Sequence, residues 1–237
     1  MESVTTGIPL QGLAIAFIPM GIAIAIIFRW SAGGNTAVYA ALRMLVQLLL
    51  IGYVLVYIFD TENPIVIAGV LVFMLVASSW IAIRPLPNKS IRTYSEVLFA
   101  ISAAGLFTLA LVSQAVLNVE PWFSPRYLVP LAGMIFAGAM NTVSIAAERL
   151  VAEQALGRGY VEARRSAFGA ALIPITNSLF AVGLVSLPGM MTGQILSGVS
   201  PLVAAKYQIV VMTMMFGASG IAAAIYLSLR RHTFNNS

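Results

Sequence analysis

The chain has 237 residues, of which 60% are hydrophobic and only 9% are charged, whereas about 25% of the residues of soluble domains are charged. Together with a mean hydropathy of +0.95, this composition excludes a disordered protein, a basic nucleic-acid-binding domain and an ordinary cytosolic enzyme. The formal net charge is +5, but the charged residues lie in short clusters between long neutral runs. We therefore interpret them as signals of membrane topology, and we expect an all-α, multi-pass protein of the cell membrane with no nucleic-acid partner.

About seven apolar segments are long enough to cross the hydrocarbon core as helices. They are 8–28, 37–59, 64–83, 97–117, 127–147, 167–187 and 203–229. The first could be a cleavable signal peptide, but no basic residue precedes Arg29, so a retained helix is favoured. Residues 167–205 carry no charge, and this stretch of 39 residues is too long for one helix. It contains the sixth span and the start of the seventh, and residues 188–202 between them form either a re-entrant helix or a plain loop.

The distribution of basic residues predicts the orientation of these spans. With seven spans, all but two of the 13 lysine and arginine residues fall on one side, the exceptions being Arg126 and Lys206. Because basic loops stay in the cytoplasm, we expect the N-terminus outside and the C-terminus in the cytoplasm. A six-span core with a peripheral first helix is the same topology counted differently. Residues 1–237 are expected to form a single transmembrane domain.

Residues for catalysis are scarce in this sequence. It contains no cysteine and one histidine, His232, which excludes a thiolate metal site, a cysteine nucleophile and a cluster of histidine ligands. An intramembrane protease would need paired aspartates, a serine–histidine pair or a metal motif, and the single aspartate is Asp60, in a loop. No acidic residue lies in the middle of a span, which argues against a proton-coupled carrier. We expect no catalytic residue.

Four polar side chains within the spans are candidates for lining a substrate pathway. Arg43 and Gln47 are one helical turn apart in the second span, and Asn141 and Asn177 lie in the fifth and sixth. Each has a structural alternative. Arg43 could extend to the lipid headgroups, and the amides could form hydrogen bonds between helices.

Methionines and helix-breaking residues gather in the last third of the chain. Met190 and Met191 follow Pro188-Gly189 directly, and they join the pathway candidates because thioethers bind soft metals. Methionine also fills irregular packing, which is its commoner use. No metal site is assigned from the sequence. Four residues are expected to break or gate helices: Pro174, Pro188, Gly189 and Gly193.

One hydrophilic segment, 148–166, separates the fifth and sixth spans. Its first half has a helical composition, and Gly157 and Gly159 interrupt it. It is either a solvated connector or a short helix that docks in a groove of a soluble partner.

Sequence motifs in and around this segment carry a resemblance to a known family. Glu153-Gln154-Ala155-Leu156-Gly157, followed by Ile173-Pro174, is similar to the cytoplasmic loop of ABC permeases. More specific stretches lie at 43–59, 129–141 and 171–208. Together they resemble the bacterial iron-export ABC permease family, which includes plant aluminium-tolerance membrane proteins, over most of the chain. The segment between Gly157 and Pro174 is a few residues shorter than is usual in that family.

The resemblance implies a permease subunit that pairs with a separate cytoplasmic ABC ATPase. This chain is expected to bind no cofactor itself, with ATP and Mg²⁺ held by the ATPase. In agreement, the sequence contains no phosphate-binding G-x-x-x-x-G-K-[ST] motif. Two permeases would form a homodimer within the bilayer, with substrate passing at their interface.

The resemblance also implies a coupling role for the hydrophilic segment. The residues expected to couple it to the ATPase are Glu153, Ala155, Leu156, Gly157, Arg158, Arg164 and Arg165. The implied substrate is iron or another metal ion for export. Ferric iron prefers carboxylate oxygens, which the spans lack, so ferrous iron, a chelate or an organic molecule such as a nucleotide sugar fits no worse. An ATP-independent carrier or channel and a membrane scaffold remain alternatives.

Overall fold

In a computed structural model, residues 9–30 and 33–234 are described, and the chain divides into two compact units, 1–60 and 61–237. The first unit contains α1 (Leu10–Ala16), α2 (Ile18–Arg29) and α3 (Gly34–Phe59). Pro19 lies in the first turn of α2, where its missing N–H costs nothing, and Phe17 separates α1 from α2. A Cβ atom on Gly34 would lie 2.5 Å from the ring of Phe28, so α2 and α3 approach closely at this point.

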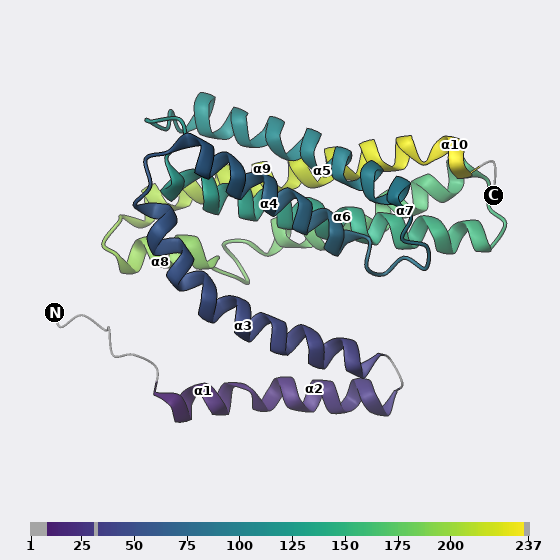
Figure 1. Ribbon diagram of the computed structural model, residues 1–237, viewed down its shortest axis with the longest axis horizontal. Coiled ribbons are helices and arrows are strands. Elements are labelled where there is room, and N and C mark those ends of the chain that lie inside the picture. The colour runs from purple at the N-terminus through teal and green to yellow at the C-terminus, as the bar shows by residue number, and fades with distance from the viewer. Residues whose placement is uncertain (1–8, 31–32, 235–237) are drawn as a thin grey trace. The chain divides into compact units, whose positions relative to one another are not determined.

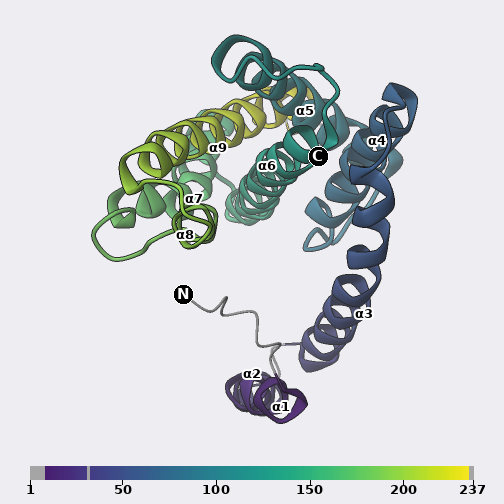
Figure 2. The ribbon, with the colours of Figure 1, turned by 90° about the vertical axis from the view of Figure 1, so that its left-hand side faces the viewer.

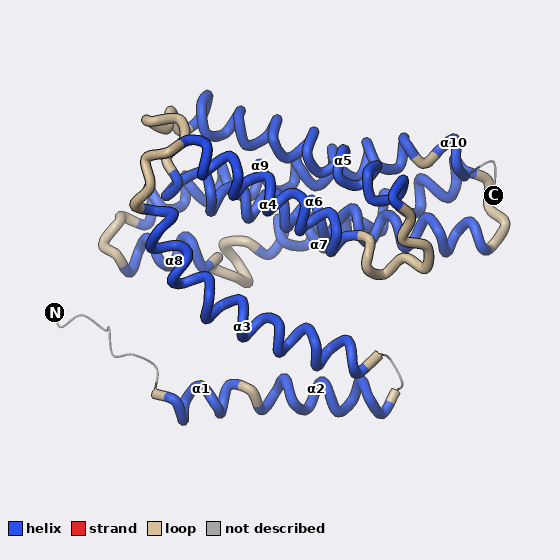
Figure 3. Tube along the Cα trace, in the orientation of Figure 1, coloured by secondary structure: helices blue, strands red, loops and turns tan. Residues whose placement is uncertain are grey.

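The second unit is a bundle of long helices (Figures 1 and 2). Its elements are α4 (Pro64–Ala82), α5 (Ile91–Ala110), the π-helix η1 (Leu111–Val116), α6 (Pro125–Ala155), α7 (Tyr160–Ala181), α8 (Gly189–Leu196), α9 (Pro201–Leu229) and α10 (Arg231–Phe234). The five longest helices of this unit run in nearly the same direction or its reverse, and α6 contacts the other four. As Figure 3 shows, the segments between the helices of this unit are loops, and no strand occurs in the described part of the chain.

Small side chains allow the helices of this bundle to pack closely. Ala132, Ala139 and Ala146 follow one another at intervals of two turns along α6, and all three are fully buried. Ala218 and Ala222 on α9 are also fully buried. Apolar side chains gain little by leaving lipid, so close backbone approach and tight packing stabilise the association of these helices.

The predicted all-α membrane fold is confirmed. Six helices of the described residues are long and apolar enough to cross a bilayer: Gln11–Arg29, Gly34–Phe59, Pro64–Ala82, Ile91–Val116, Pro125–Ala155 and Pro201–Leu229. The sixth predicted span, 167–187, is not one of these six helices. Its helix, α7, stops at Ala181, and the first turns of α7 carry charged residues. Residues 188–202 are not a plain loop, since α8 occupies the first half of them.

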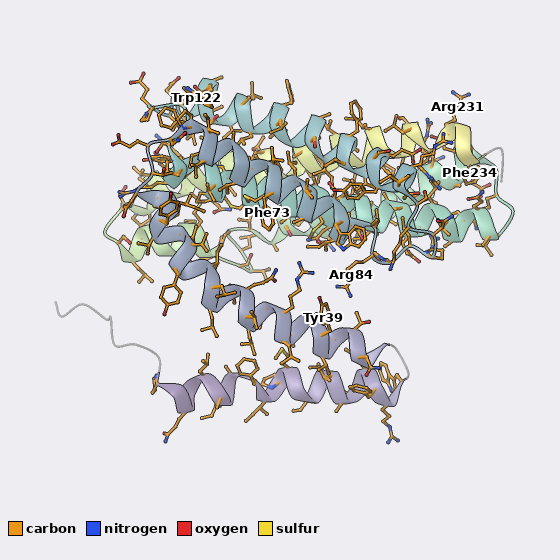
Figure 4. All side chains as sticks on the ribbon, in the orientation of Figure 1. Tyr39, Phe73, Arg84, Trp122, Arg231 and Phe234 are labelled. Carbon is orange, nitrogen blue, oxygen red and sulfur yellow. The ribbon has the colours of Figure 1, made fainter. Side chains whose placement is uncertain are left out.

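Basic residues gather at one end of the second unit, where α4, α6 and α9 end and α5 and α7 begin. We call this the basic end. Figure 4 shows Arg231 and Phe234 there, and Trp122 at the opposite end. The basic residues of the connections and helix termini at this end are Arg84, Lys89, Arg92, Arg149, Arg158, Arg164, Arg165, Arg230 and Arg231. A cytoplasmic location of the basic end is the orientation predicted from the sequence.

Candidate functional site

The α6–α7 hairpin forms the most polar feature of the basic end. The helix α6 continues to Ala155, two turns beyond the predicted end of its span at 147, and α7 begins at Tyr160. Gly157 has a φ of +72°, a conformation that glycine adopts without strain. Its N–H donates to the carbonyl of Gln154 and that of Arg158 donates to the carbonyl of Glu153, which is the Schellman pattern that ends a helix. The segment 148–166 is therefore two helix ends joined by a tight turn.

The carboxylate of Glu153 connects the parts of this hairpin. Its Oε1 lies 2.6 Å from Nη2 of Arg149, one turn earlier on α6, and its Oε2 lies 2.8 Å from Nη1 of Arg158 in the turn. Ser166, on α7, donates its hydroxyl to Oε1 at 2.6 Å. The side chain of Glu153 is completely buried, whereas those of Arg149 and Arg158 are about half exposed. A buried carboxylate is stable only when it is paired in this way, so the Glu153 cluster fixes the turn against both helices.

The outer surface of the hairpin is apolar at its tip and basic around it. Leu156 and Val161 are each 70% exposed, although both are large hydrophobic residues. Arg158, Arg164 and Arg165 of the same hairpin are also exposed. An exposed apolar tip at the end of a rigid hairpin is typical of a surface that binds another protein.

Aromatic and polar contacts tie the hairpin to the rest of the basic end. The hydroxyl of Tyr160 donates to the carbonyl of Leu227, near the end of α9, at 2.6 Å. The ring of Tyr160 lies edge-on to Phe234 of α10, with 5.6 Å between centroids, and Arg164 lies over the same ring. Gln154 donates to the carbonyl of Phe234. The start of α7 is therefore held against α9 and α10.

A second ionic contact joins α5 to α9 at the basic end. Glu96 on α5 pairs with Arg92 one turn earlier at 3.1 Å and with Arg230, just after α9, at 3.3 Å. Glu96 is only 11% exposed and Arg230 only 18%. Because the partners come from helices far apart in sequence, this pair fixes the relative position of α5 and α9.

The Tyr160 hydrogen bond leads to a testable expectation. Tyr160→Phe keeps the ring and its packing but leaves the carbonyl of Leu227 without this donor. We expect the free energy of unfolding to fall by about 1 kcal/mol, measured by unfolding in detergent micelles. Tyr127→Phe is the control, because Tyr127 is 51% exposed and lies outside this network. Equal stability of the two variants would contradict the anchoring role.

The structure brings some of the predicted pathway residues together and leaves others apart. Asn177, Pro188, Gly189 and Met190 line one cavity of 550 Å³ among α7, α8 and α9. Asn141 and Pro174 line a separate cavity of 160 Å³. Met191 lines a third, of 360 Å³.

The remaining predicted residues lie elsewhere. Gly193 is in the middle of α8. Arg43 and Gln47 are one turn apart on α3, in the first unit. The helix α7 runs without interruption past Pro174, whereas residues 182–188 are not helical. The helix α7 therefore continues past Pro174 and ends at Ala181, and Pro188 and Gly189 lie where α8 begins.

Three residues of these sites were not among the sequence candidates. Ser166 and Tyr160 complete the hairpin, and Gln208 on α9 lines both the 550 Å³ and the 360 Å³ cavities. Gln208 could have been noticed as a polar residue in a span. Ser166 and Tyr160 could not, because their roles depend on contacts across the turn. Within residues 9–30 and 33–234, no group of three or more acidic, histidine or cysteine residues could hold a metal ion.

Comparison with known proteins relates this chain to a family of membrane proteins. The sequence profile of the uncharacterised protein family UPF0014 matches residues 10–234. The UPF0014 membrane protein slr1647 of Synechocystis is 33% identical over 91% of this chain and 90% of its own length. The probable iron export permease protein FetB of Escherichia coli is 33% identical over 88% and 81%, respectively.

A plant protein is also similar. The protein ALUMINUM SENSITIVE 3 of Arabidopsis thaliana is 34% identical over 78% of this chain and 72% of its own length. These relatives confirm the resemblance found in the sequence. No solved structure matches the chain.

Proposed function

Because the chain belongs to the UPF0014 family of membrane proteins, we propose that it is the permease subunit of an ABC transporter that exports iron or another metal ion. The chain is a multi-pass membrane protein, and one relative is named a probable iron export permease. ATP is hydrolysed by a separate cytoplasmic subunit, since this sequence contains no phosphate-binding loop. The observation that carries the proposal is the α6–α7 hairpin, with an apolar tip exposed at the basic end.

The hairpin is proposed to be the docking element for the ATPase. Leu156 and Val161 offer an apolar contact of the kind that enters a groove of a partner, and the arginines around them select an acidic rim. The Glu153 cluster makes the hairpin stiff, because one buried carboxylate contacts α6, the turn and α7. A stiff element transmits a displacement, whereas a flexible loop would absorb it.

The long helix α6 is proposed to carry this displacement into the membrane. It contacts the other four long helices of its unit, so a movement of its cytoplasmic end changes the packing of the whole bundle. The cavities among α6, α7 and α9 lie beside the same helix and are the proposed route of the substrate. Two copies of the chain in the bilayer, each bound to one ATPase subunit, complete the proposed assembly.

The test is co-purification of the chain with its candidate ATPase from membranes. We expect a stable complex, and we expect Leu156→Glu to reduce the ATPase recovered by about tenfold, because a charge in a buried apolar contact is left without a partner. Leu184→Glu is the matched control. Leu184 is 89% exposed and lies in the turn after α7, at the other end of the unit from the hairpin.

Two outcomes would contradict the proposal. If the wild-type chain recovers no ATPase, the ABC partnership is wrong. If the Leu156→Glu variant recovers as much ATPase as the Leu184→Glu variant does, a complex exists but the hairpin tip is not its docking surface.

A further inference from the structure

Four neighbouring cavities with some lining residues in common lie beside α9 in the second unit. The cavity of 550 Å³ shares Met215 with the cavity of 160 Å³ and Met212 with the cavity of 360 Å³. It shares Met134 and Met190 with a fourth cavity, of 320 Å³. A methionine is among the shared residues in each case, together with Ile175, Val182, Gln208 or Val211.

Each of these cavities also contains an oxygen atom that lacks a partner. The hydroxyl of Ser219, the Oε1 atom of Gln208 and the Oε1 atom of Gln194 are buried, and none has a hydrogen-bond partner among the described residues. Ser219 lines the 160 Å³ cavity, Gln208 the 550 Å³ and 360 Å³ cavities, and Gln194 the 320 Å³ cavity. Gln208 is only 5% exposed, so water outside the bundle does not satisfy it. Unsatisfied buried acceptors are rare and call for an explanation.

The lining of the central cavity is rich in electron-pair donors and has no charge. Four thioethers and the amide oxygen of Gln208 are donors, and no residue lining the 550 Å³ cavity is charged. Arg126 lines the 320 Å³ cavity, which makes that cavity less suitable for a cation. A divalent or trivalent ion would need carboxylates to offset the loss of its hydration. A monovalent ion needs less compensation, and thioether sulfur prefers soft ions such as Cu(I).

We propose that the 550 Å³ cavity is a binding site for a soft monovalent cation of the Cu(I) class. The thioethers of Met134, Met190, Met212 and Met215 supply its ligands, and the unpartnered oxygen of Gln208 faces the same space. This inference deepens the proposed function and rests on it in one respect, namely that the bound ion is then exported. It names a substrate different from the iron in the name of one relative, because the cavity offers four thioethers and no carboxylate.

The probe is Ag(I), a soft monovalent ion that is not oxidised under the conditions of the assay. The full-length chain in lipid nanodiscs, without the ATPase, is titrated with Ag(I) by calorimetry, and X-ray absorption then identifies the neighbours of the bound ion. We expect sulfur neighbours, and we expect Met190→Leu with Met212→Leu to weaken binding by about tenfold or more. Leucine has nearly the volume of methionine, so packing is kept.

The control is the double variant Met140→Leu with Met214→Leu. Both residues belong to or pack against the core of the same helices, but neither lines one of the four cavities. We expect this control to bind Ag(I) like the wild type. A second variant, Gln208→Leu, is expected to weaken binding as well, and it keeps all four thioethers.

Several results would overturn the inference. They are the absence of Ag(I) binding, binding without sulfur neighbours, and equal losses of Ag(I) affinity in the cavity double variant and the control double variant. An organic molecule found in the cavity of the purified chain, and not displaced by Ag(I), would also overturn it. Because the titration omits the ATPase, sulfur-ligated Ag(I) in a chain that recovers no ATPase would refute the ABC proposal alone. A stable complex without Ag(I) binding would refute this inference alone.

Discussion

Glu153→Gln is expected to uncouple ATP hydrolysis from transport while the subunit still reaches the membrane. Glutamine can still accept the hydroxyl of Ser166, but it offers no charge to Arg149 and Arg158. The turn is then no longer fixed to α6 by an ion pair, and a displacement at the hairpin tip is absorbed locally. We expect ATP-driven transport in proteoliposomes to fall by about tenfold or more, within the usual range of coupling between distant sites.

The hairpin itself provides the matched control. Glu162→Gln makes the same chemical change nine residues away, but Glu162 is 67% exposed and its nitrogen partner on Arg158 is 3.6 Å distant. Exposed ion pairs of this kind contribute little. Transport by Glu162→Gln should therefore match the wild type. If Glu153→Gln and Glu162→Gln transport equally well, the buried carboxylate does not couple the two subunits.

Gly105→Ala adds only one methyl group, but it is expected to destabilise the second unit more than such a small change suggests. The added Cβ atom would lie 2.7 Å from Cε1 and 2.8 Å from Cδ1 of Phe136, which is only 2% exposed. The helices α5 and α6 cannot move apart to make room, because that movement would disturb the other helices that pack on α6. Overpacking of this kind costs about 1–3 kcal/mol, and we expect unfolding in micelles to show a loss in that range.

Gly69→Ala on α4 is the control for Gly105→Ala. A Cβ atom on Gly69 would meet nothing within 4 Å, and alanine is the better helix former. This variant should be as stable as the wild type or more stable. Combining Gly105→Ala with Phe136→Leu should recover part of the loss, because the two residues contact each other and their effects are not additive. A harmless Gly105→Ala would show that α5 and α6 do not pack as described.

The helices of this fold could be predicted well from hydropathy alone. The expected span 64–83 is α4, Pro64–Ala82, and the expected span 203–229 is α9, Pro201–Leu229. The reason is physical, because a segment in lipid must satisfy its backbone hydrogen bonds internally and so becomes a helix. Hydropathy does not predict the ends of a helix that extends beyond the bilayer or stops within an apolar segment. The polar sequence 148–155 favours a helix outside the bilayer, and the apolar residues 182–187 do not form one.

The candidate site could be predicted only in part. Glu153 could be singled out from its motif, but its burial and its hydrogen bond to Ser166 depend on how the chain turns back at Gly157. Methionines could be recognised as metal ligands in principle. Their meeting in one cavity with an unpartnered Gln208 depends on the packing of α6, α7, α8 and α9. Sequence shows which donors exist, and tertiary structure decides which of them face a common space.

The central claim is that this chain is the permease of an ATP-driven metal exporter. Its most direct test is the ATPase activity of the chain purified with its ATPase subunit in nanodiscs, measured with and without ferrous iron and Cu(I). The account predicts a stable complex whose ATP hydrolysis increases when the metal ion is added, with Cu(I) the more effective of the two. A complex that hydrolyses ATP at the same rate with either ion as without metal would contradict metal export.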